Sequence, residues 1–403
     1  MGETSGAVVT WRAALQLVTT MTCVALLASC SSDPGPVMKV SSSAESAVSA
    51  PGSPTSASST TAAAESCGAP ELAKLTLRQK LAQRLMVGVT GAADARQAVT
   101  EEGIGGIFIG AWTDPAILTD GSVKRISASS KVPLMVSVDQ EGGRVSRLAK
   151  IGIDFPSARA MVQKGMTPEQ VQAEARKAGE AMAKLGITVD YAPSVDVSDQ
   201  PDDAVIGDRS YSNDPEVVTR YAGAFAKGLQ EAGIMPVYKH FPGHGHSSGD
   251  SHLGSVTTPP LSQLIEHDLV PYKTLLKDPG NAAVMMGHLI VPGLTKGDTP
   301  TSISARAIGM LRTGTRYGGP AFDGVIISDD LSGMKAITDR YSIDQAVLRA
   351  FQAGSDIGLW LSTDSVSTVL DTLESAVRSG KLNRAKVDAS VVRILRAKGV
   401  LSC

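Results

Sequence analysis

The segment GVIISDDL, residues 324–331, is a short apolar run that ends in a serine and two acids. A run of this length and composition is typical of a buried β-strand whose polar residues begin where the strand ends. Seven further runs of the same kind occur in the chain: Leu85–Thr90, Gly105–Gly110, Val132–Gln140, Ile187–Val197, Met235–Phe241, Ala282–Val291 and Asp356–Thr363. The sequence therefore predicts eight buried strands.

Segments with helical periodicity lie between most of these runs. They include Thr167–Leu185, Asp214–Ala232, Leu261–Leu276 and Ile343–Ala353, and a last helix covers Arg384–Lys398. Strands that alternate with helices favour a parallel sheet with helices packed on its outer face. We therefore predict an α/β protein with a single (β/α)8 TIM-type barrel over residues 67–403. A doubly wound open sheet is the structural alternative.

The charge balance argues against a polyanionic partner. The chain has 38 Lys+Arg against 40 Asp+Glu, a net charge of −2, and only 4% of its residues are aromatic. Proteins that bind nucleic acid usually carry a basic excess, so we predict no nucleic-acid partner.

The first 66 residues have the composition of an export signal and a tether. Arg12 precedes an apolar run that ends in Leu27-Ala28-Ser29-Cys30, which resembles a bacterial lipobox. We predict a lipoprotein signal peptide over residues 1–29, lipidation of Cys30, and a membrane anchor through that lipid. Residues 30–66 are rich in Ser, Ala, Thr and Pro, a composition that predicts a disordered tether.

The two remaining cysteines outside these features are Cys67 and Cys403, at the two ends of the predicted barrel. A barrel brings its first and last elements together, and exported proteins meet oxidising conditions. The sequence leaves open whether these two residues form a disulfide bond or remain free thiols.

Polar residues cluster where the predicted strands end. They are Asp139-Gln140-Glu141, Asp196, Lys239-His240, His288 and Asp329-Asp330. The active sites of (β/α)8 barrels lie at the carboxyl ends of the strands, so we expect these side chains to surround one mouth.

The densest group of titratable residues lies in the segment KHFPGHG, residues 239–245, and continues to Asp250-Ser251-His252. Four of the six histidines lie between positions 240 and 252. Histidine and aspartate are good metal ligands, but Pro242, Gly243 and Gly245 exclude a helix that would place two of them on one face. We therefore predict neither a catalytic metal nor any other cofactor.

The pair Asp329-Asp330 ends a buried strand, so only one of the two carboxylates can face the barrel axis. A carboxylate in that position can attack an acetal carbon and form a glycosyl-enzyme intermediate. Without other motifs, a role as a helix cap or turn acceptor would be the simpler interpretation.

Four motifs together closely resemble glycoside hydrolase family 3. They are Lys239–Gly245 with Asp250-Ser251-His252, residues 138–147 (VDQEGGRVSR), residues 206–210 (IGDRS) and residues 328–331 (SDDL). Within the family they are similar to the NagZ-type β-N-acetylglucosaminidases, and the predicted lipobox is similar to a lipoprotein branch.

The resemblance implies a role for each matching residue. Asp329 would be the catalytic nucleophile, and His252 the general acid/base with Asp250 as its partner. Asp139, Arg147, Arg209, Lys239 and His240 would bind the sugar, whereas His288 is a weaker match. Asp196 and Asp330 would be structural, and His246 matches no family position.

The resemblance also implies a substrate and a location. We expect a retaining enzyme that releases terminal β-linked N-acetylglucosamine from peptidoglycan fragments outside the cytoplasmic membrane, acting as a monomer. The alternatives are a family 3 β-glucosidase or β-xylosidase, an N-acetylglucosaminide phosphorylase, and a non-catalytic wall-binding lipoprotein. The sequence does not distinguish which aglycone the enzyme would accept.

Overall fold

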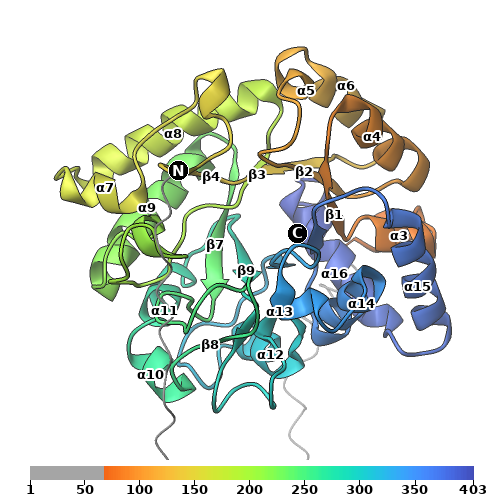
Figure 1. Cartoon of the computed structure of the whole chain (residues 1–403). Coiled ribbons are helices and arrows are strands. Elements are labelled where there is room, and N and C mark those ends of the chain that lie inside the picture. Colours follow the sequence, from red (N-terminus) through yellow and green to blue (C-terminus); the bar gives the residue numbers. More distant parts are fainter. Residues whose placement is uncertain (1–67) are drawn as a thin grey trace, which may run out of the picture. The chain divides into compact units, whose positions relative to one another are not determined.

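The computed structural model describes residues 68–403, which belong to one compact unit (Figure 1). Eight parallel strands form its centre: β1 (Leu85–Val89), β2 (Gly106–Ile109), β3 (Met135–Val138), β6 (Val189–Asp190), β7 (Met235–Phe241), β9 (Ala283–Met286), β11 (Ile326–Ser328) and β12 (Gly358–Trp360). Each of them lies inside one of the eight predicted runs. The predicted strands are therefore confirmed, although most of them are shorter than the apolar run that contains them.

Pairing between the first and last strands closes the sheet into a barrel. Each strand pairs with the next central strand in the chain, and β12 pairs with β1 through Leu85↔Gly358. A single parallel bridge, Ile327↔Ile357, joins β11 to β12. The predicted TIM-type barrel is confirmed, because a doubly wound sheet would leave two free edges.

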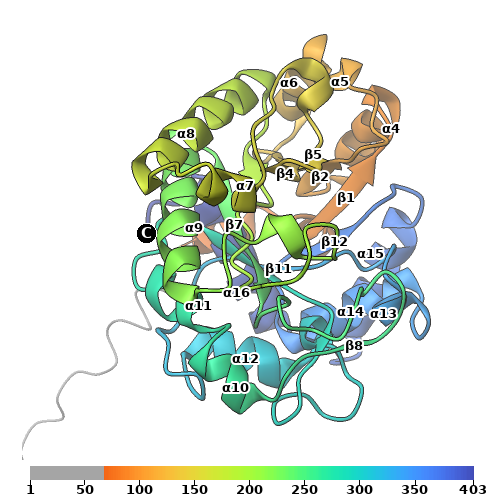
Figure 2. The ribbon, with the colours of Figure 1, turned by 60° about the vertical axis from the view of Figure 1, so that its left-hand side comes forward.

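Helices cover the outside of the barrel (Figure 2). The longest are α8 (Pro168–Leu185), α9 (Pro215–Glu231), α14 (Ile343–Ala353), α15 (Val366–Arg378) and α16 (Arg384–Ala397). The shorter ones are α2 (Ala69–Ala73), α3 (Leu77–Ala82), α4 (Ala92–Gln97), α5 (Ala116–Thr119), α6 (Ser122–Ser129), α7 (Ala158–Gln163), α10 (Leu261–Glu266), α11 (Val270–Leu275), α12 (Ala305–Thr313) and α13 (Lys335–Thr338). Short 3-10 or π turns lie at Ala98–Glu102, Ala149–Ile151, Gly207–Arg209 and Thr301–Ile303.

Local sequence explains where the two longest helices begin. Thr167 accepts a hydrogen bond from the backbone N–H of Gln170, whose side chain in turn accepts one from the N–H of Thr167. The Asp214 carboxylate caps the first turn of α9 in a similar way, and a proline follows each cap. Such caps satisfy backbone donors that have no partner within the helix.

The strands separate two buried apolar layers. Along β1, Met86 faces the barrel interior together with Met135, Val237 and Ile327, whereas Leu85 and Val87 face the surrounding helices. This alternation follows from the two-residue period of a strand. Because apolar side chains fill the interior, the polar residues are left to gather at the carboxyl ends of the strands.

Three local features differ from the prediction. The single helix expected over 261–276 is two helices, α10 and α11, because the chain turns at His267. A small antiparallel hairpin, β4 (Gln140–Gly142) with β5 (Val145–Ser146), extends from the end of β3. Another short pair joins β8 (Val256–Thr257) to β10 (Leu289–Ile290).

The predicted signal peptide (1–29), the lipidation site Cys30, the tether (30–66) and Cys67 lie outside the described residues. Cys403 is disulfide-bonded, and because the other cysteines all lie outside the described residues, its pairing with Cys67 stays a prediction. Within residues 68–403, none of the helices has the length and apolar character needed to cross a bilayer.

Candidate active site

A cavity of about 280 Å³ opens at the carboxyl ends of the strands. Seven of the eight residues predicted to act on or bind the sugar line it: Asp139, Arg147, Arg209, Lys239, His240, His252 and Asp329. They come from segments spread over 190 positions of the sequence, which the barrel brings to one mouth. The eighth, Asp250, does not line the cavity but contacts the side chain of His252, which does.

The two acids that follow β11 have different environments. Asp329 is buried in the cavity wall, and one of its carboxylate oxygens accepts a hydrogen bond from the backbone N–H of Asp330 at 2.9 Å. Asp330 instead accepts hydrogen bonds from Ser332 and from the N–H of Gly333, each at 2.8 Å. Asp330 therefore holds the turn after the strand, while the carboxylate of Asp329 remains available for chemistry.

Asp329 is kept ionised by its surroundings. Burial opposes ionisation, but His240, His288, the N–H of Asp330 and Lys239 outweigh it and lower the pKa of Asp329. For Asp330 burial dominates and raises the pKa. The pKa values of the two adjacent carboxyl groups therefore shift in opposite directions, because their neighbours differ.

A buried ion network forms the floor of the cavity. Lys239 Nζ lies 2.7 Å from Asp139 Oδ1 and 2.6 Å from Glu141 Oε1. Glu141 also receives two hydrogen bonds from the guanidinium of Arg209, each at 2.8 Å. Burial opposes the charge on Glu141, yet Arg209 and Lys239 lower its pKa strongly. Glu141 therefore fixes the positions of both cations.

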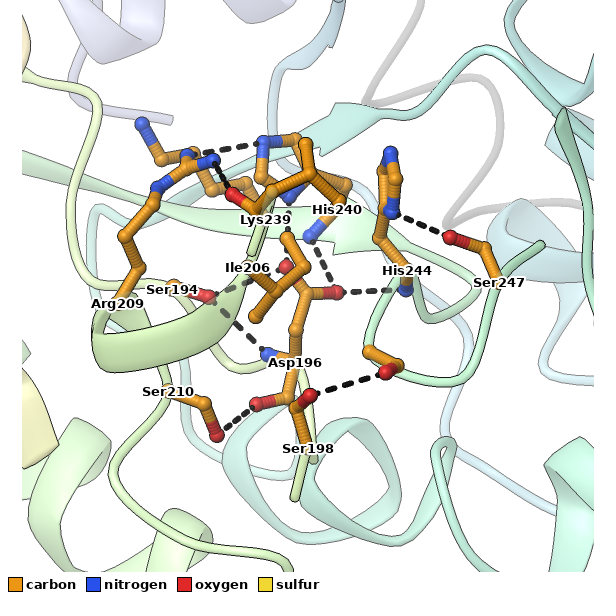
Figure 3. Close-up of polar contacts among 12 residues, drawn as sticks. Ser194, Asp196, Ser198, Ile206, Arg209, Ser210, Lys239, His240, His244 and Ser247 are labelled. Carbon is orange, nitrogen blue, oxygen red and sulfur yellow. Dashed lines mark hydrogen bonds and ion pairs between the residues drawn. The ribbon is translucent and has the colours of Figure 1, made fainter. Parts of the chain in front are cut away.

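His240 is oriented by a buried aspartate (Figure 3). Asp196 Oδ2 lies 2.6 Å from His240 Nδ1, and Asp196 Oδ1 accepts hydrogen bonds from the backbone N–H groups of His240 and His244. Burial opposes ionisation of Asp196, but His240 and His244 lower its pKa strongly. The contact on Nδ1 leaves His240 Nε2 facing the cavity and Arg209, at 3.5 Å.

His244 and His288 are held away from solvent by other contacts. His244 is buried, which lowers its pKa to about 4, and its Nδ1 lies 2.8 Å from Ser247 Oγ. The two ring nitrogens of His288 contact Ser302 Oγ and the backbone oxygen of Asp330, both at 2.7 Å. With both nitrogens engaged, His288 supports the turn that carries Asp329 and does not line the cavity.

His252 lies at the rim of the cavity with Asp250 as its partner. Its Nδ1 is 2.7 Å from Asp250 Oδ1, and the same oxygen accepts a hydrogen bond from the His252 backbone N–H at 2.9 Å. Burial raises the pKa of Asp250, but the hydrogen bonds from His252 outweigh it and lower the pKa. The His252 side chain is 55% exposed, so its Nε2 is accessible to a molecule entering the cavity.

Sequence reasoning missed two parts of the site. Glu141 stands in a motif that we quoted, but it received no role. Three aromatic residues, Phe108, Trp112 and Tyr191, also line the cavity, with the Phe108 ring stacked on Tyr191 and next to Trp112. Trp112 is 46% exposed and offers a flat apolar surface near the entrance.

Among residues 68–403, three or more His, Cys, Asp or Glu side chains come close enough to share a metal ion at one place, which consists of His246, His267 and Asp268. None of the three lines the cavity. Inside the cavity, Lys239 and Arg209 are instead paired with Asp139 and Glu141.

Comparison with known proteins is consistent with this geometry. Residues 76–397 match the glycosyl hydrolase family 3 N-terminal domain. The chain is 56% identical over 337 residues to a Mycobacterium tuberculosis protein named beta-hexosaminidase LpqI, with 83% of this chain and 86% of that protein covered.

Solved structures give the same result. A family 3 glycosyl hydrolase from Mycobacterium smegmatis superposes with a TM-score of 0.80 at 56% identity, covering 82% of this chain and 99% of that one. A family 3 beta-N-acetylglucosaminidase from a Paenibacillus species has a TM-score of 0.75 at 33% identity, covering 81% of this chain and 62% of that one. The chain belongs to glycoside hydrolase family 3.

Proposed function

We propose that this glycoside hydrolase is a retaining exo-β-N-acetylhexosaminidase that releases terminal β-linked N-acetylglucosamine. The observation that carries the proposal is one cavity in which an ionised, buried Asp329 faces several sugar-binding groups, with the His252–Asp250 pair at its rim. The names of the relatives support the choice of sugar.

In the first half of the reaction, an Asp329 carboxylate oxygen bonds to the anomeric carbon as the glycosidic C–O bond breaks. His252 donates a proton to the leaving oxygen. In most glycosidases a carboxylic acid donates this proton. In the second half, neutral His252 takes a proton from water as the water oxygen attacks the same carbon and Asp329 departs.

The His252–Asp250 contact suits this exchange of protons. An ionised Asp250 on Nδ1 holds the imidazole with Nε2 toward the cavity, where this nitrogen can exchange a proton with the leaving group. Exposure of His252 at the rim lets it reach the leaving group on one side and water on the other. Gly243 and Gly245 are packed against Asp268 and Val197, so a movement that brings His252 toward a bound sugar would begin after them, near the open Gly249.

The remaining polar residues would position the sugar. Lys239, Arg209 and Asp139 present donors and acceptors suited to hydroxyl groups, while Arg147 lines the same cavity. Unpaired cations beside the anomeric carbon would oppose the positive charge of an oxocarbenium-like transition state. Glu141 and Asp139 neutralise much of the charge of Lys239 and Arg209 and so reduce this repulsion.

Hydrolysis rates on two aryl glycosides test the sugar specificity. We expect purified protein to cleave an aryl β-N-acetylglucosaminide much faster than the matching aryl β-glucoside. Faster cleavage of the glucoside would place the chain in another branch of family 3, and no activity from folded protein would favour a binding role. Product analysis with and without phosphate distinguishes hydrolysis from phosphorolysis.

We further propose that the physiological substrate is a peptidoglycan fragment and that the enzyme works as a monomer outside the cytoplasmic membrane, held there by a lipid on Cys30. The signal and lipobox patterns at residues 1–30 support this location. Metabolic labelling with a fatty-acid probe tests the anchor, because Cys30→Ala should remove the label and release the protein from membranes.

A further inference from the structure

We propose that His246, His267 and Asp268 form a divalent transition-metal site, best suited to Zn²⁺, that fastens the base of the catalytic loop. His246 belongs to the loop that continues to Asp250 and His252. His267 and Asp268 lie at the turn between α10 and α11. A metal held by all three would therefore join the loop to the outer shell of the barrel.

The side chains are already gathered in a suitable arrangement. One potential ligand atom from each of the three residues lies within 4.8 Å of the other two. His246 Nδ1 is 2.9 Å from Asp268 Oδ1, and His267 Nδ1 is 3.7 Å from Asp268 Oδ2. Zn²⁺ binds imidazole nitrogen and carboxylate oxygen at roughly 2.0–2.2 Å, so side-chain rotations of modest size would bring the three atoms onto one ion.

Accessibility and rigidity also fit a metal with one open position. Asp268 is 4% exposed and fixed, whereas the side chains of His246 and His267 are 30% and 40% exposed and can reach an ion from solvent. Three protein ligands and one water complete a tetrahedral zinc shell. The proposed site takes only His246 from residues 240–252, so it differs from a catalytic ion held within that segment, which Pro242, Gly243 and Gly245 disfavour.

The loop backbone rests directly on the proposed site. Gly243 has a φ of +130°, and a Cβ at this position would lie 2.5 Å from the Cβ of Asp268. The loop therefore already packs against one ligand at Gly243, and a metal would add a second attachment three residues later at His246. Metal binding is therefore expected to make the loop more stable. The metal itself would take no part in the reaction.

Zn²⁺ binding to the purified protein, measured by calorimetry, tests the proposal directly. Wild-type protein should bind one high-affinity ion. Loss of a residue that only supports a metal ligand already weakens metal binding by roughly 10–100-fold, so His267→Ala, which removes a ligand, should weaken it by on the order of 100-fold. Glu266→Gln is the matched control, because Glu266 is the exposed neighbour of His267 and is not among the three proposed ligands.

His252→Ala distinguishes this site from the His252–Asp250 pair, which could also hold zinc. The proposal requires His252→Ala to keep wild-type affinity, and loss of binding there would overturn it. Co²⁺ gives a readout that does not depend on activity, because a tetrahedral nitrogen and oxygen site produces visible absorption bands. These bands should be absent in His267→Ala, and zinc should raise the melting temperature of wild type but not of this variant.

Discussion

Replacing Glu141 by glutamine should destabilise the fold and impair substrate binding together. Glu141 contacts Arg209 and Lys239, and its side chain is only 5% exposed. Removing one partner of a buried ion pair costs about 3–5 kcal/mol, because the other charge stays buried without compensation. In the variant Lys239 would still contact Asp139, which lies 2.7 Å away, so one of the two cations keeps a partner. We therefore expect a loss of unfolding free energy at the lower end of this range, about 3 kcal/mol.

Urea unfolding measures this loss, with Glu266→Gln as a control for removal of an exposed carboxylate. The midpoint should fall without a change in the slope of the unfolding free energy with denaturant. A loss below about 1 kcal/mol, comparable to a surface pair, would refute the argument that Glu141 neutralises both cations.

The effect of Glu141→Gln should also depend on pH. Folding lowers the pKa of Glu141, so its contribution is complete above the unfolded value of about 4.3 and disappears as the pH falls through the lowered folded value. The difference in unfolding free energy between wild type and variant should therefore shrink in acid.

Glu141→Gln should also impair catalysis. At neutral pH, displacement of Arg209 and Lys239 should reduce kcat/KM by roughly 100-fold.

Four further measurements test the proposed chemistry. Asp329→Ala should abolish turnover with unchanged circular dichroism, and activity within tenfold of wild type would exclude Asp329 as the nucleophile. His252→Ala should slow natural disaccharides more than aryl glycosides with good leaving groups, whereas equal losses would argue against an acid role. Because the pKa of Asp329 is lowered, the acid limb of kcat/KM should lie below the ordinary aspartate value of about 3.9, and a midpoint above about 5 would contradict this. EDTA should leave kcat unchanged in His267→Ala, which lacks one ligand of the proposed loop site, and a loss in this variant that zinc reverses would show that a metal takes part in the reaction.

The sequence predicted the eight strands because each is an apolar run with polar residues at its carboxyl end. The strand period indicated that one of the two acids would face the barrel axis without saying which, and only the resemblance chose Asp329; in the structure both Asp329 and Asp330 line the cavity. The role of Glu141 was not predictable in the same way. It follows β3 within a hairpin, where the strand period no longer applies, and its partners Lys239 and Arg209 lie 98 and 68 positions away.

The break at His267 was missed for a related reason. Apolar residues continue with helical spacing from Leu261 to Leu276, and this spacing masked the one local sign of a break, Pro271, which lies in the first turn of α11. The aromatic residues Phe108, Trp112 and Tyr191 come from β2, the loop after it, and the end of β6. Nothing in their local sequence shows that the barrel places their rings side by side.

The two proposed catalytic groups are attached to the molecule in different ways. Asp329 is fixed at the end of a barrel strand, surrounded by buried groups, whereas His252 stands half exposed on a loop that contributes little to the core. Substitutions near Asp329 would disturb folding and sugar binding at once. Substitutions on the exposed rim beside His252 can alter the contacts with a leaving group while the buried groups that would hold the sugar stay in place.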